Sequence, residues 1–220
     1  MQKLFENFRK FSTEDNNIRI AAVGDSLTVA GNTYIKMLDG KHYGQGGQPS
    51  WRLGKHLDRA LRTKPDYLII FMGTNDVGWR GGCSDWHIKL KSILGSMYER
   101  VKVESPKTKI IGMTLLSGGV KKPSRWADRW ARCPKKPVHC CKQKHPDILL
   151  RKTIEVNDFI LNYPGVIGID NSDMWDEYGI LSAKGSKYVK GHREGGDRIH
   201  LSSAGQAHLA NKIEAIIGRN

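Results

Sequence analysis

Serine, aspartate and histidine residues stand at positions that could carry out acyl transfer. Ser26 follows Gly24 and Asp25, and the segment Asp197-Arg198-Ile199-His200 places a carboxylate three residues before a histidine. Across one turn of chain the Asp197 carboxylate can reach Nδ1 of His200, which leaves Nε2 to accept the proton of a serine hydroxyl. The pattern predicts Ser26 as nucleophile, His200 as its base and Asp197 as the group that orients the base.

A third motif, Gly73-Thr74-Asn75-Asp76, could supply a hydrogen-bond donor. The side-chain amide of Asn75 can donate to an oxygen that becomes negative during the reaction, and so can the backbone N–H of Ser26. Each motif alone also has a plain structural explanation as a turn, a helix cap or a surface pair. We assign Asp25 and Asp76 to turn structure rather than to proton transfer.

Short apolar segments alternate with segments of helical periodicity. Strands are predicted over 18–23, 67–72, 109–116 and 166–170. Helices are predicted over 50–61, 86–103, 148–161 and 203–217, the last with Ser203 as its N-cap. The strand segments are apolar at nearly every position, as strands buried on both faces are.

This alternation predicts a parallel sheet covered by helices on both faces, a three-layer α/β/α sandwich of flavodoxin-like type. We interpret residues 1–220 as a single domain. Ligands of such sheets bind beyond the carboxyl ends of the strands. Ser26 and Asn75 each follow a predicted strand closely, and His200 lies in the chain that comes after the fourth strand. The fold therefore predicts that the three motifs meet at one edge of the sheet.

Composition limits the class of protein. Hydrophobic residues make up 39% of 220 and charged residues 26%, a balance typical of a folded domain rather than of a disordered chain. No apolar run approaches the roughly 18 residues of a membrane span. The N-terminus shows no secretory h-region, so a cytoplasmic location is expected, and a viral or particle-borne origin stays open. The spacing of apolar residues over 4–11 predicts a short amphipathic helix.

A basic insertion at about 117–147 interrupts the alternation. The formal net charge of the chain is +14, and residues 117–152 hold eleven Lys and Arg against two Asp. Such a charge predicts attraction to anionic partners. Trp126 and Trp130 lie four residues apart among three arginines, which suits either a substrate-binding face or simple packing on the domain. Trp79 follows the Asn75 motif and is a further candidate for substrate binding.

The same insertion is rich in thiols and imidazoles. Cys133, His139, Cys140, Cys141 and His145 fall within 13 residues. Their spacing matches no standard zinc pattern, so we expect no metal. Without a metal, these cysteines are either reduced thiols or part of a disulfide. Such a disulfide would lie within the insertion or join it to Cys83.

Together the three motifs resemble the SGNH/GDSL hydrolase superfamily. The resemblance rests on residues 22–28, 73–76 and 197–205, in the family's order. It implies the SGNH hydrolase fold, a Ser26–His200–Asp197 triad, and an oxyanion hole made of the Ser26 N–H, a glycine N–H and the Asn75 amide. Gly47 best matches that glycine by its position, and Gly46 is the alternative. The resemblance also implies that no cofactor is needed.

The function expected from these features is ester hydrolysis. The substrate suggested is a short acyl ester, most simply acetyl, on a polysaccharide or another anionic polymer. A lysophospholipase or thioesterase is the alternative within the class. A non-catalytic protein that binds an anionic polymer is the rival from another class, with nucleic acid an unlikely ligand, and a metal-bound insertion that docks a partner is a third reading.

Overall fold

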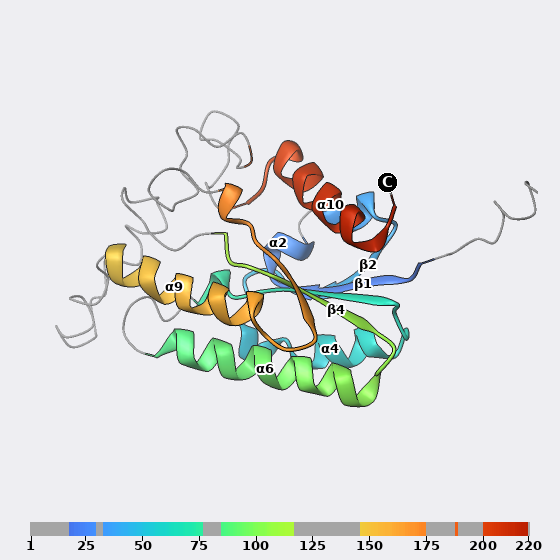
Figure 1. The fold of residues 1–220 in the computed structure, drawn as a ribbon, viewed down its shortest axis with the longest axis horizontal. Helices are drawn as coiled ribbons and strands as arrows, with labels where there is room; N and C mark the ends of the chain where they lie inside the picture. Colours follow the sequence, from blue (N-terminus) through green and yellow to red (C-terminus); the bar gives the residue numbers. More distant parts are fainter. Residues whose placement is uncertain are drawn as a thin grey trace, which may run out of the picture.

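Figure 1 shows the chain in a computed structural model, which describes residues 18–29, 33–76, 85–116, 146–174, 188 and 200–219. Among these residues five strands form a sheet. Their bounds are β1 Ile20–Gly24, β2 Lys41–Gly44, β3 Tyr67–Phe71, β4 Lys109–Met113 and β5 Val166–Ile169. The strand order is β2-β1-β3-β4-β5, and every neighbouring pair is parallel. This order is the flavodoxin-like one that the sequence predicts.

Helices lie on both faces of the sheet (Figure 1). The α-helices run over Ser26–Val29 (α2), Tyr34–Met37 (α3), Gly54–Leu61 (α4), Trp86–Glu104 (α6), Pro146–Leu161 (α9) and Ser203–Ile217 (α10). Two 3₁₀ turns, η1 and η2, cover Ser50–Arg52 and Ser172–Met174. Helices α3 and α10 pack on one face, and α4, α6 and α9 on the other, so the predicted three-layer architecture is confirmed.

Alternation along the strands divides the buried side chains into two cores. In β1 and β3, Ala22 and Ile69 face α10, whereas Ala21 and Leu68 face α4 and α6. This is the period-2 geometry of a strand, with successive side chains on opposite faces. Every residue of β1 and of β3 is buried, as expected for central strands of a parallel sheet.

The predicted elements lie close to those observed, although several ends differ by one or two residues and the strand predicted over 109–116 ends at Met113. Two helix starts differ from the prediction in their local structure. The helix predicted over 50–61 opens with the 3₁₀ turn η1, and α4 starts only at Gly54. The last helix starts at Ser203 as predicted, but its N-cap is Ser202 rather than Ser203. Ser202 has extended backbone (ψ 170°), and its Oγ accepts a hydrogen bond from the N–H of Gly205 at 3.2 Å.

The sequence-based prediction missed strand β2. Its residues, Lys41-His42-Tyr43-Gly44, are exposed or half-buried and show no apolar alternation. In the described sheet β2 is an edge strand that pairs with β1 alone. An edge position needs little apolar surface, so the strand leaves almost no hydrophobic signal.

No described helix is both long enough and apolar enough to cross a lipid bilayer. The N-terminal helix predicted over 4–11 lies outside the described residues, and so does the basic insertion as far as residue 145. Its last two residues, Pro146 and Asp147, begin α9.

Candidate active site

Ser26 lies at the carboxyl end of β1, as the first residue of α2. The backbone oxygen of Asp25 accepts hydrogen bonds from the N–H groups of Thr28 (3.1 Å) and Val29 (3.3 Å), which closes the turn. Oδ1 of Asp25 accepts a further bond from the N–H of Leu27 at 3.1 Å, so the aspartate caps this short helix. Ser26 itself is half-buried. The turn therefore fixes Ser26 at the sheet edge and leaves part of it open to a ligand.

The glycine loop after β2 runs beside Ser26. The N–H of Gln45 donates to the backbone oxygen of Gly24 at 3.2 Å. A methyl group built on Gly46 would lie 3.6 Å from Cβ of Ser26, so Gly46 passes directly next to the serine. Gly47 has φ of +69°, a left-handed conformation that glycine adopts readily. The loop thus brings both candidate glycines to the neighbourhood of Ser26.

Asn75 follows β3, the other neighbour of β1. The N–H of Asp76 donates to the oxygen of Gly73 at 3.0 Å, which folds the chain into a tight turn. Nδ2 of Asn75 donates to the backbone oxygen of Gln48 at 3.2 Å. An amide nitrogen carries two hydrogens, so this bond orients the side chain and leaves one hydrogen for a ligand.

A buried carboxylate joins the same two loops a second time. Asp76 is 1% exposed and accepts hydrogen bonds from the N–H of Ser50 (2.8 Å) and from its Oγ (2.6 Å). We assigned Asp76 to its own turn, and the sequence did not reveal its bond to Ser50. No local pattern could show it, because the partners are 26 residues apart.

Asp25 is fully buried, and this burial determines the pKa of its carboxyl group. Its Oδ2 makes no hydrogen bond within the described residues. Burial is the largest cause that raises the pKa of Asp25, and the nearby charge of Asp76 also raises it. The N–H groups of Leu27 and Gly73 and the charge of His200 lower it, and the net result is a pKa of about 6 in place of the ordinary 3.8. The carboxyl group thus holds its proton into the weakly acidic range.

His200 comes to the same edge from the far end of the chain. Its charge affects the pKa of Asp25, so the imidazole lies within electrostatic range of the residue that precedes Ser26. Leu201 is buried in the core under α10, and the N–H of Ser202 donates to the backbone oxygen of Tyr188 at 2.9 Å. His200 therefore stands on a segment that is anchored immediately after it.

A polar cluster on α10 anchors the neighbouring chain. Nε2 of His208 lies 2.6 Å from Oδ2 of Asp173, and Nζ of Lys212 lies 2.5 Å from Oδ1 of the same residue. The ring of Tyr188 stacks on His208 with centroids 4.7 Å apart. These contacts tie η2 and Tyr188 to the helix that follows His200.

The structure thus brings Ser26, the Gly46–Gly47 loop and Asn75 together at the carboxyl edge, with His200 nearby. Four predicted site residues, Asp197, Trp79, Trp126 and Trp130, lie outside the described residues. So do the cysteines and histidines that raised the question of zinc or a disulfide.

The raised pKa of Asp25 predicts that Asp25→Asn changes how stability depends on pH. Between about pH 4 and pH 6 the native protein keeps a proton that the unfolded chain has released, so stability from this group is present at low pH and is lost as the pH rises through 6. At 1.36 kcal/mol per unit the loss is about 3 kcal/mol. Asparagine does not titrate.

We therefore expect the difference between the free energies of unfolding of D25N and of the wild type to change by about 3 kcal/mol in favour of D25N between pH 4 and pH 7. Urea denaturation at each pH measures this difference. Groups that titrate alike in both proteins cancel in this difference. A difference that stays constant with pH would show that Asp25 is ionised throughout.

The arrangement has the parts that acyl transfer requires. A hydroxyl, an imidazole, glycine N–H groups and an oriented amide lie at the point where the strand order reverses between β1 and β3. Doubly wound sheets bind their ligands at this point.

Known proteins resemble this chain in sequence and in fold. The model of the GDSL-like lipase/acylhydrolase family matches residues 22–208. No curated protein sequence matches the chain. A proposed acylhydrolase from Bacteroides fragilis is similar in structure, with a TM-score of 0.67 and 19% identity over 97% of this chain and 95% of the other.

Two further solved structures share the fold. A GDSL-like lipase from Bacteroides thetaiotaomicron has a TM-score of 0.65 and 17% identity over 98% of each chain. An acetyl xylan esterase has a TM-score of 0.59 and 18% identity over 91% of this chain and 100% of its own. At such identities the likeness shows the fold, while the family match covers most of the sequence. The chain belongs to the GDSL-like lipase/acylhydrolase family, whose members are ester hydrolases.

Proposed function

We propose that the protein hydrolyses carboxylic esters with Ser26 as nucleophile, and that its substrate is an acetyl ester on a carbohydrate. One observation carries the proposal: Ser26, the Gly46–Gly47 loop and Asn75 lie together where β1, β2 and β3 end. A nucleophile with oxyanion donors beside it is what acyl transfer needs.

The proposed reaction has two stages. His200 takes the hydroxyl proton of Ser26 as the serine oxygen attacks the ester carbonyl, and the N–H groups of Ser26 and Gly47 with the Asn75 amide stabilise the oxyanion. His200 then gives the proton to the departing alcohol, which leaves an acyl-serine. Water, deprotonated by His200, attacks that ester, and His200 returns the proton to the oxygen of Ser26 as the bond to the acyl group breaks and the acid is released. Asp197 would orient His200.

Support for a short acyl group comes from the sequence and one relative. The sequence has no long apolar stretch that would line a tunnel for an acyl chain. One similar structure is that of an acetyl xylan esterase. The net charge of +14 suits a polar or anionic polymer that carries the ester. A lysophospholipase or thioesterase remains the alternative within the class.

The proposal is tested by hydrolysis of p-nitrophenyl acetate, butyrate and laurate. We expect kcat/KM to be highest for acetate and to fall with chain length, because the sequence has no long apolar stretch that would line a tunnel for an acyl chain. A preference for laurate would favour the lipid or thioester alternative. No hydrolysis of any ester, including acetylated xylo-oligosaccharides, would contradict the proposal and favour a protein that only binds anionic polymers.

A further inference from the structure

The segment that follows His200 is clamped by the backbone of Tyr188. The backbone oxygen of Tyr188 accepts a hydrogen bond at 2.9 Å from the N–H of Ser202, two residues after His200. A methyl group built on Gly205 would lie 2.2 Å from the same oxygen, far closer than a carbon atom can approach. The chain at Tyr188 therefore runs against the first turn of α10, and the glycine at position 205 leaves room for it.

The side chain of Tyr188 is held by α10 as well. Its ring stacks on the imidazole of His208, with centroids 4.7 Å apart and an angle of 29° between the planes. Nε2 of His208 lies 2.6 Å from Oδ2 of Asp173, and this contact orients the imidazole. The ring on which Tyr188 stacks is thus set by a carboxylate from η2, a separate part of the chain.

Asp173 is engaged from two sides. Its Oδ1 accepts a hydrogen bond from Nζ of Lys212, which lies one turn after His208 on α10 and also donates to the backbone oxygen of Asp170 at 2.6 Å. Partial desolvation raises the pKa of Asp173, but the hydrogen bonds from Lys212 and His208 outweigh it, and the net pKa lies below the ordinary value. Asp173 is therefore ionised at neutral pH and joins η2 to α10 as a charged group.

The turn that carries Asp173 is anchored to the sheet. Asn171, two residues earlier, is fully buried, and its N–H donates to Oγ1 of Thr114 at 2.8 Å. Its Nδ2 donates to the backbone oxygen of Thr114 at 3.0 Å, and Thr114 directly follows β4. A continuous series of contacts thus runs from the end of β4 through η2 and α10 to Ser202, next to the segment that carries His200.

Four side chains form what we call the Asp173 latch: Asp173, Tyr188, His208 and Lys212. We propose that this latch positions His200 for proton transfer, and that Asp173 and His208 are positioning residues of the reaction. The latch fixes the segment that carries the imidazole relative to the sheet, whose β1 carries Ser26 at its end. A small displacement of a base from its nucleophile slows the reaction strongly. The inference rests on the proposed function.

The test measures kcat and KM for p-nitrophenyl acetate in variants of the latch. In Asp173→Ala we expect kcat to fall about tenfold and KM to stay within about twofold of the wild type, because His200 acts in both proposed stages and the proposed oxyanion donors are unchanged. Asp173→Asn keeps one acceptor oxygen and should recover part of the loss. His208→Phe keeps a ring that can stack on Tyr188, so it should retain more activity than His208→Ala.

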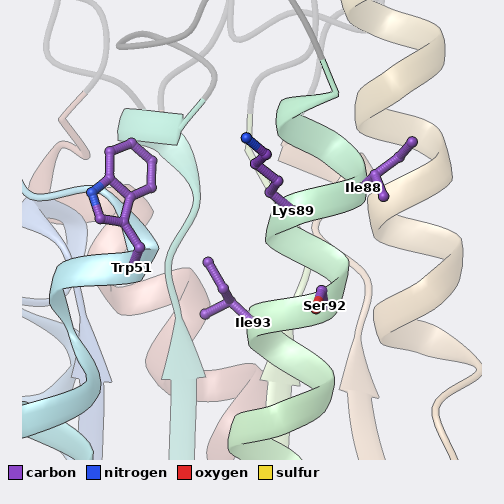
Figure 2. Close-up of a pocket in the computed structure, with 5 residues that line it drawn as sticks. All are labelled: Trp51, Ile88, Lys89, Ser92 and Ile93. Atoms are coloured by element: carbon purple, nitrogen blue, oxygen red, sulfur yellow. The ribbon is translucent and has the colours of Figure 1, made fainter.

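Matched controls alter similar groups on the other face of the sheet. Asp58→Ala removes a carboxylate that is paired with Arg100 at 2.8 Å, and the Asp58 side chain is 46% exposed against 47% for Asp173. Lys89→Met is the control for Lys212→Met, since Lys89 stands on α6 and lines a shallow groove beside η1 (Figure 2).

D58A and K89M should keep the kcat of the wild type, whereas K212M should lower it. A kcat for D173A no lower than that of D58A would overturn the proposal. A loss expressed in KM alone would also overturn it, because the cluster would then serve substrate binding rather than the position of the base.

Amide hydrogen exchange separates this inference from the proposed function. In D173A the amide of Ser202 should exchange at least about tenfold faster than in the wild type, because its acceptor on Tyr188 is held less firmly, while the amides of β3 should exchange as before. If the wild type hydrolyses no ester, the proposed function fails, but faster exchange confined to the region of Ser202 would still support the latch. Unchanged exchange at Ser202, or an equal change in β3, would overturn it.

Discussion

Ser26→Ala is expected to lower kcat for p-nitrophenyl acetate by about 10⁴-fold or more, since removing a serine nucleophile leaves only the contribution of the oxyanion donors and of binding. The substitution removes one oxygen from a half-buried side chain. The turn itself is held by Asp25 through its backbone oxygen and Oδ1, neither of which belongs to Ser26. The stability of the S26A variant should therefore stay near that of the wild type.

The measurement is steady-state hydrolysis with the folded state checked by circular dichroism. Ser96→Ala is the matched control, because Ser96 is an exposed serine on α6 whose Oγ donates to the backbone oxygen of Ser92 at 2.9 Å. It should keep full activity. A fluorophosphonate should label the wild type and S96A but not S26A. Activity in S26A within tenfold of the wild type would assign the nucleophile elsewhere.

Asp76→Ala is expected to cost about 3 kcal/mol of stability. Each hydrogen bond to a buried charged group contributes about 1.5–3 kcal/mol, and removal of Asp76 leaves the N–H of Ser50 without its acceptor. One effect opposes this loss. The charge of Asp76 raises the pKa of Asp25, so its removal makes ionised Asp25 less costly. The net change should still be a large destabilisation, measurable as a lower urea midpoint.

The same variant should lose more activity than its unfolded fraction explains. Of the hydrogen bonds described above between the two loops, the one from Asn75 to Gln48 would remain, so the proposed donors around Ser26 would be less well positioned. Ser50→Ala is the matched comparison, since it removes the 2.6 Å bond and keeps the backbone one. It should cost about 1 kcal/mol. A D76A protein as stable as the wild type would show that this clamp is not structural.

Much of the fold was predictable because its central strands are buried on both faces. Such strands are apolar at almost every position, and the segments that became β1, β3 and β4 show this. The segment that became β5 is apolar too, although β5 lies at an edge of the described sheet and is mostly half-buried. The placement of Ser26 and Asn75 followed from it, because strands that are adjacent and parallel end at the same edge.

Features that depend on partners distant in the chain could not be predicted. Strand β2 is polar and exposed, so its pairing with β1 has no counterpart in its own composition. The hydrogen bond between Asp76 and Ser50 joins two loops, so it produces no periodic pattern in the sequence. The raised pKa of Asp25 depends on complete burial, which a turn-forming aspartate does not suggest.

The edge position of β2 has an energetic consequence for catalysis. Marginal strands open locally at a lower free energy than the core does, and β2 carries the loop that holds Gly46 and Gly47. The proposed donor geometry would then exist only in the fraction of the ensemble in which this edge is closed. A substrate bound by the glycine N–H groups, as proposed, would select that fraction, and its apparent affinity would be lowered by the free energy needed to order the edge. Substitutions that make β2 adhere more firmly to β1 would raise apparent affinity without touching the ligand.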